Sequence, residues 1–127
     1  MTVPSSDEQE LEHWFFENIS TDKKQVFKKF EMTISVMQDA DSIRRVAYEA
    51  VEDLVEDGVV YGELRYAPLQ HLQGKLSSQE VVDAVSTGIK DGQKDFGGEF
   101  YTILCAMRQH KNSTEVAELA IKNFNNK

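Results

Sequence analysis

Two charged residues interrupt an otherwise apolar stretch, DGVVYGELRYAP, at residues 57–68. Side chains alternate along a strand, so Glu63 and Arg65 would lie on the same face of it. Together they could act as an acid and an anion-binding group. They could equally form a buried ion pair or polar layer that is hydrogen-bonded to neighbouring strands. Because buried charges are stable only when such partners are available, the second, structural interpretation is favoured.

The histidines and the cysteine give little sign of catalysis or metal binding. His71 and His110 each follow a predicted strand by a few residues, where the functional groups of many α/β enzymes gather. Each lacks a second donor at ligand spacing, whereas a zinc site needs three or four converging groups. His13 is expected at the surface, and Cys105, in the apolar run YTILCAM, is expected to be a small buried residue. Local patterns therefore predict no catalytic residue and no metal ligand.

The composition is that of an acidic globular protein of 127 residues, with a net charge of −8. Duplex nucleic acid is bound through clustered Lys and Arg, so it is not an expected partner. No apolar run reaches the roughly 18–20 residues of a membrane-spanning helix, and no signal sequence follows Met1. A single cysteine excludes an internal disulfide. These features predict a cytoplasmic protein that binds neither nucleic acid nor membrane.

Hydrophobic periodicity predicts the order helix, helix, helix, strand, helix, strand, helix. Helices are expected at about residues 10–18, 21–37, 42–56, 77–96 and from 114 onward, and strands at about 59–66 and 100–107. Asp41 is the expected N-cap of the third helix, and Ser77 and Glu80 form a capping box before the fourth. Both strands are nearly continuous apolar runs, as in strands covered on both faces. The order indicates an α/β fold with two parallel strands, whose open edges suggest part of a larger sheet.

Three runs of residues resemble consecutive pieces of adenosine deaminases: VAYEAVEDLVEDGVVYGELRYAP, LSSQEVVDAVSTGIKDGQKDFG and ILCAMRQH. The preceding FKKF…ISVM segment is similar to the helix before them, and the resemblance extends from about Leu11 to Leu119. It implies a partial (β/α)8 barrel of the TIM type and a hydrolase of purine metabolism. In that family a zinc-bound hydroxide attacks C6 of adenosine or deoxyadenosine, and ammonia leaves to give the inosine product.

The resemblance assigns few functional residues to this chain. Phe27 and Phe30 match an apolar flap over the nucleoside pocket, and Met107 matches a pocket-lining position at the end of the third barrel strand. His110 departs in register from the family's usual Met-Arg-His, because a glutamine follows the arginine here. The family's zinc ligands and catalytic glutamate have no counterparts in the chain. Catalytic and metal-binding residues are therefore expected to be none, and no zinc is expected to bind this segment alone.

Residues 1–127 are accordingly interpreted as a single incomplete domain, an N-terminal-third segment that carries the second and third strands of a deaminase barrel. The segment is expected to be catalytically inactive alone, although the purine nucleoside is the partner of the parent enzyme. The alternative is a non-catalytic module, derived from this fold, that binds a nucleoside or another protein. Open strand edges also favour self-association.

Overall fold

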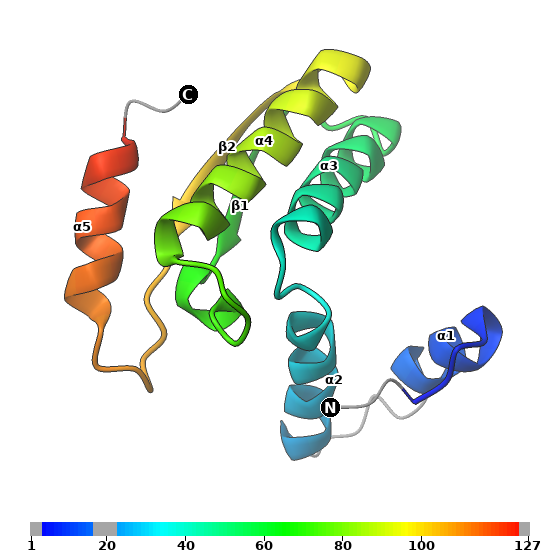
Figure 1. Ribbon diagram of the computed structural model, residues 1–127. Coiled ribbons are helices and arrows are strands. Elements are labelled where there is room, and N and C mark those ends of the chain that lie inside the picture. Colours follow the sequence, from blue (N-terminus) through cyan, green and yellow to red (C-terminus); the bar gives the residue numbers. More distant parts are fainter. Residues whose placement is uncertain (1–3, 17–22, 125–127) are drawn as a thin grey trace. The chain divides into compact units, whose positions relative to one another are not determined.

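The computed structural model describes residues 4–16 and 23–124, which fall into two compact units (Figure 1). The first unit ends at Val36 and contains helices α1 (Glu8–Phe16) and α2 (Lys23–Ser35). The second contains α3 (Ala40–Glu56), β1 (Tyr61–Tyr66), the short 3-10 helix η1 (Pro68–His71), α4 (Ser78–Phe96), β2 (Glu99–Leu104) and α5 (Ser113–Asn123). None of the helices in the described ranges has the length and apolar character that a membrane crossing requires. The single incomplete domain of residues 1–127 stays a prediction.

In the first unit, α1 begins where Asp7 accepts a hydrogen bond from the backbone N–H of Glu10, at 3.0 Å. The ammonium of Lys29 on α2 donates to the carbonyl of Phe15 at the end of α1, at 2.6 Å, and lies 5.9 Å from the ring centre of Trp14. A cation at a helix C-terminus satisfies a carbonyl that has no partner within the helix. The predicted extension of the first helix to residue 18, and the predicted start of the second at residue 21, lie outside the described residues. The second helix ends at Ser35 rather than at residue 37.

The two strands of the second unit pair in parallel, with Tyr61 opposite Glu99 and Tyr66 opposite Leu104. The α/β fold and parallel pairing predicted from the sequence are confirmed. Both strands are shorter than the predicted ranges 59–66 and 100–107.

The physical reason for the later start of β1 is the way α3 ends. Gly58 adopts a φ of 84°, its N–H donates to the carbonyl of Val55, and the N–H of Val59 donates to the carbonyl of Leu54 at 2.8 Å. This is the Schellman arrangement, in which the residue after the left-handed glycine still belongs to the helix cap. At the other strand, the chain turns after Cys105, where the N–H of His110 bonds the carbonyl of Met107.

The core of the second unit lies between α3, α4 and the sheet. It consists of Ile43, Ala47 and Val51 from α3, Val81, Ala84, Val85 and Ile89 from α4, and Phe100 from β2. Two glycines allow α4 to lie directly against α3. A Cβ atom at Gly88 would stand 2.2 Å from the backbone oxygen of Arg44, and one at Gly92 would stand 2.8 Å from the Cβ of Val51. Contacts this short show that the helix backbones approach more closely than any larger residue would permit.

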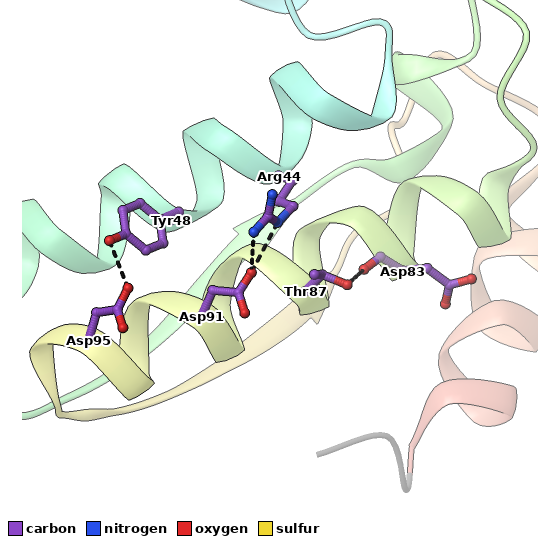
Figure 2. A network of polar contacts seen from close by, with 6 residues as sticks. All are labelled: Arg44, Tyr48, Asp83, Thr87, Asp91 and Asp95. Carbon is purple, nitrogen blue, oxygen red and sulfur yellow. Dashed lines mark hydrogen bonds and ion pairs between the residues drawn. The ribbon is translucent and has the colours of Figure 1, made fainter.

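Polar contacts follow the rim of the same helix pair (Figure 2). Arg44 donates from Nε and Nη2 to the Oδ2 atom of Asp91, at 3.0 and 2.6 Å, and the hydroxyl of Tyr48 donates to Asp95 at 3.0 Å. Arg44 and Tyr48 are one turn apart on α3, and their partners Asp91 and Asp95 are one turn apart on α4. The two contacts therefore connect successive turns of one helix to successive turns of the other. Exposed ion pairs contribute little free energy, so we assign these contacts a role in alignment.

Among the described residues of the second unit, helices α3 and α4 cover one face of the sheet. Leu64 and Tyr66 pack against the core, whereas Tyr61, Arg65 and Ile103 are exposed. The prediction that both faces of both strands are covered is therefore wrong for the described residues. The reason is that α3 and α4 pack on the same side of the two strands.

The caps of α3 and α4 explain where these helices start. Asp39, not the predicted Asp41, caps α3, because its Oδ1 and Oδ2 atoms accept from the N–H and the hydroxyl of Ser42, at 2.9 and 2.8 Å. The capping box of α4 is confirmed. The N–H of Ser77 donates to the Glu80 carboxylate at 2.8 Å, and the N–H of Glu80 donates to the Ser77 hydroxyl at 3.3 Å.

Replacement of Gly88 by alanine tests the close approach of the helices. The new methyl group would meet a backbone carbonyl, so Gly88→Ala is expected to lower the free energy of unfolding by about 1–3 kcal/mol. At a solvent-exposed helix position the same change would stabilise the protein by up to about 1 kcal/mol, because alanine has a higher helix propensity than glycine. Urea unfolding followed by circular dichroism measures the difference, with the exposed Lys94→Ala as control. A Gly88→Ala protein as stable as the wild type would contradict the packing.

The capping box makes stability depend on pH. Hydrogen bonds from the backbone N–H and the hydroxyl of Ser77 lower the pKa of Glu80 below its ordinary value of 4.5. A group with a lowered folded-state pKa stabilises fully above the unfolded value and loses that contribution as the pH falls through the folded value. Thermal melting below pH 4.5 should therefore show a smaller loss of Tm in Glu80→Gln than in the wild type. Asp53→Asn, at an exposed carboxylate outside the caps, should keep the wild-type slope.

Candidate functional site at the carboxyl ends of the strands

The candidate site lies where β1 and β2 end, because parallel α/β folds bind ligands at the carboxyl ends of their strands. At this end of the sheet, the N–H of Cys105 donates a hydrogen bond to the carbonyl of Tyr66 at 2.9 Å. Beyond it, the loops after both strands and the start of α5 enclose a small cavity of about 10 Å³, lined by Ala67, Leu69, Ala106, Met107, His110 and Val116 among others. Such a volume holds about one water molecule. This cavity is therefore too small to hold a nucleoside.

The loop after β1 is held by contacts with the segment that precedes α3. The imidazole of His71 is 8% exposed, and its Nδ1 atom lies 2.8 Å from the carbonyl oxygen of Met37. A carbonyl only accepts, so Nδ1 carries the proton. Gln38 donates from Nε2 to the carbonyl of Gln70 at 3.1 Å and accepts from the N–H of Gln73 at 2.9 Å. These bonds give His71 and Gln38 a structural role.

A second polar contact connects the two loops to each other. The Nε2 atoms of Gln70 and His110 are 3.0 Å apart, so the glutamine amide donates to an unprotonated ring nitrogen. His110 is exposed and follows Met107 by a tight turn. The arrangement fixes the position of Met107 at the edge of the small cavity. It offers an imidazole for hydrogen bonding, but no acidic partner joins it from the described residues.

Tyr66, the last residue of β1, carries a buried hydroxyl that has no hydrogen-bond partner within the described part of the chain. Burial, with a smaller effect of the Asp83 charge, raises the pKa of this phenol. Its ring packs against the core on the helix-covered face. Tyr66 therefore belongs to the interior of the unit rather than to the site.

The three residues predicted to bind substrate fall in both units. Phe27 and Phe30 lie three positions apart on α2, so they share one face of the helix, and they are 63% and 60% exposed. Met107 is half-buried in the second unit and lines the small cavity. The structure thus brings the two phenylalanines together. A common pocket for all three residues stays a prediction.

Glu63 and Arg65 do not form a buried ion pair with each other, which is one of the two structural alternatives predicted from the sequence. The other alternative, a polar layer with neighbouring strands, stays a prediction. Both are exposed on the open face of the sheet. Glu63 accepts a hydrogen bond from the hydroxyl of Tyr61 at 3.0 Å, which raises the pKa of that phenol. Arg65 makes no hydrogen bond or ion pair with any described residue. Glu63 lies in the middle of β1 and Arg65 directly before its last residue, and neither lines the small cavity at the carboxyl ends of the strands.

The zinc implied by the resemblance does not fit the residues at hand. Within residues 4–16 and 23–124, no three side chains of His, Cys, Asp or Glu come together in a way that could hold a metal ion. A catalytic zinc site needs three protein ligands. We therefore assign no step of a reaction to a metal held by these residues. That the chain binds no zinc by itself stays a prediction.

The structural role of Gln38 in this region was not predicted from the sequence. Its partners are 32 and 35 positions away, and both are backbone groups. A contact of this kind leaves no periodic pattern and no motif. Only the turn-forming residues around Gly74, whose Cβ would stand 2.5 Å from the carbonyl oxygen of Gln38, hint at a close approach there.

Comparison with known proteins places the whole chain in one group. The family model described as adenosine deaminase matches residues 1–127. The adenosine deaminase of Mycobacterium avium is 41% identical over 126 residues, which are 94% of this chain and 34% of that protein. Adenosine deaminase 1 of Streptomyces coelicolor is 42% identical over 124 residues, which are 93% of this chain and 31% of that protein. The chain thus spans about a third of the length of these curated relatives.

A pair of histidine variants tests which imidazole supports the fold. His71→Leu removes a buried donor and leaves the carbonyl of Met37 without its partner, so a loss of about 1–3 kcal/mol in the free energy of unfolding is expected. His110→Ala, at an exposed position, should change it by less than about 0.5 kcal/mol. Chemical denaturation of both variants provides the measurement. Equal losses would show that the loop after β1 is not held by His71.

Proposed function

The chain belongs to the adenosine deaminase family, and we propose that it forms the second and third βα units of a barrel that converts adenosine or deoxyadenosine to inosine or deoxyinosine. The observation that carries this proposal is a match along almost the whole chain, combined with a parallel β1–α4–β2 unit. That unit is the repeating element of a (β/α)8 barrel. Strand β1 would be the second barrel strand and β2 the third.

We assign the described residues a role in binding rather than in the chemical step. Phe27 and Phe30 present apolar rings on one face of α2, and covering a nucleoside would remove this apolar surface from water. Met107 offers a polarizable thioether, a suitable contact for the face or edge of a purine. None of these side chains transfers a proton. They would therefore lower the substrate's dissociation constant and leave the hydrolysis to other groups.

The chain alone is proposed to be inactive, because the residues described here supply neither a zinc site nor an acid and base that converge. A non-catalytic module that binds a nucleoside or another protein is the second candidate. The exposed phenylalanines and the open strand edge favour it. The cytoplasmic location and self-association predicted from the sequence stay predictions.

A chimera distinguishes the deaminase proposal from the non-catalytic module. In the M. avium adenosine deaminase, the aligned region is replaced by this chain, and adenosine turnover is followed by ultraviolet absorbance. The chimera should be active, whereas the 127-residue chain with added zinc should not. In the chimera, Phe27→Ala and Met107→Ala should each raise KM about 10-fold or more with a smaller effect on kcat, since each removes about 1.5–3 kcal/mol of apolar burial.

The matched control is Phe16→Ala, which removes an exposed phenylalanine from α1, outside the proposed flap. It should leave KM unchanged. An inactive chimera that is folded would contradict the deaminase assignment. An active chimera whose KM is unaffected by Phe27→Ala and Met107→Ala would contradict only the binding roles of these two residues.

A further inference from the structure

The loop between β2 and α5 carries Met107 and has one side-chain hydrogen bond to the loop after β1. Within the described residues, the part of this loop from 106 to 111 hydrogen-bonds to the rest of the unit only through the imidazole of His110. A second bond is internal to the loop, from the N–H of His110 to the carbonyl of Met107 at 3.0 Å. His110 therefore holds Met107 by its backbone and contacts the other loop by its side chain.

The partner of His110 is Gln70, whose own backbone is fixed. Gln70 lies in η1, where Pro68 is fully buried. The N–H of Gln70 donates to the carbonyl of Ala67 at 3.0 Å, and the carbonyl of Gln70 accepts from Gln38 at 3.1 Å. A side chain that extends from a backbone held in this way determines where its hydrogen-bond partner lies.

The contact depends on which position of the turn the histidine occupies. His110 lines the small cavity together with Met107, whereas Gln109 is exposed and does not line it. The Met-Arg-His order that the family resemblance implies would place the histidine at position 109. In this structure, the side chain that meets Gln70 is the one at position 110. The residue order of this chain thus supplies the acceptor that Gln70 requires.

We propose that Gln70 and His110 are positioning residues for substrate binding, because their hydrogen bond holds the thioether of Met107 in a fixed place beside the cavity. The inference rests on the proposed function, in which Met107 contacts the purine. In this role neither residue touches the substrate or transfers a proton. A side chain that is ordered before binding loses less conformational entropy when the ligand binds. Loss of the bond should therefore raise KM, with a smaller effect on kcat.

Two substitutions at position 110 of the chimera separate the hydrogen bond from the shape of the ring. His110→Phe keeps a flat ring at the cavity and removes the acceptor, so KM for adenosine should rise about 2- to 10-fold, the factor that one net hydrogen bond is worth. His110→Gln restores an acceptor of similar reach and should keep KM close to the unsubstituted value. The control is Gln109→Ala, in the same turn but outside the cavity lining, which should leave KM unchanged.

A change at the donor provides an independent check. Gln70→Ala removes the amide and leaves the backbone contacts of η1 in place, so it should raise KM as much as His110→Phe does. The combined variant should show no larger increase than either single one, because both substitutions break the same bond. Increases that add up would show that the two side chains act separately, and this would contradict the proposal.

A measurement on the 127-residue chain tests the hydrogen bond without catalysis. The methyl group of Met107 is labelled with carbon-13, and its order parameter is obtained from NMR relaxation. The methyl group should be more mobile in His110→Phe than in the wild type, and as ordered in His110→Gln as in the wild type. Circular dichroism shows whether the variants are folded.

Equal increases of KM in His110→Phe and His110→Gln would overturn the proposal, because the ring and not the hydrogen bond would then be responsible. A KM that rises in Met107→Ala but not in His110→Phe would overturn it as well. A folded chimera without activity contradicts the proposed function. Unaltered mobility of Met107 in His110→Phe contradicts the positioning role instead, so the two failures are distinguishable.

Discussion

The close contact between α3 and α4 is the constraint on which the second unit depends. Gly88 and Gly92 place backbone against backbone, so the small side chain of Ala47 and the branched one of Val51 can fill the remaining space. Because α3 leads into β1 and α4 connects β1 to β2, this one contact holds both strands on the same side of the helices. The polar contacts of Arg44 and Tyr48 lie at the rim of this helix pair and help to align α3 with α4. The described residues of this unit form two strands, which have little other apolar surface to bury. The stability of the unit therefore depends on this helix pair.

The same packing decides what the carboxyl ends of the strands can do. The segment before α3 is fixed by the helix that follows it, and through His71 and Gln38 it holds the loop after β1. That loop in turn meets the loop after β2 at the contact between Gln70 and His110. Met107 is thereby positioned, and no acid and base converge beside it within the described residues. A role of this corner in substrate binding stays a proposal.

The sequence predicts what is local and misses what depends on neighbours. The capping box at Ser77 depends on residues a few positions apart, and it is confirmed. The end of α3 at Gly58 is set by equally local contacts. The N-cap of α3 was misplaced because Asp39 and Asp41 both precede a helical pattern, and only the geometry around Ser42 distinguishes them. Strand ends and Gln38 depend on partners far along the chain, which periodicity does not report. Short motifs did not predict the barrel fold. The family resemblance, which extends over long runs of residues, did.

The open face of the sheet explains why Glu63 and Arg65 looked out of place in an apolar strand. Tyr61 and Tyr101 lie 5.9 Å apart on this face, and their hydroxyls donate to Glu63 and Glu99, respectively. Four polar side chains of adjacent strands therefore satisfy one another, while Arg65 has no acceptor within the described residues. In a (β/α)8 barrel this face points inward, where side chains from alternate strands form layers. A layer of this kind is complete only when another strand provides a carboxylate or carbonyl for Arg65. The arginine that two strands leave without a partner is thus the residue that most directly relates this chain to a larger sheet.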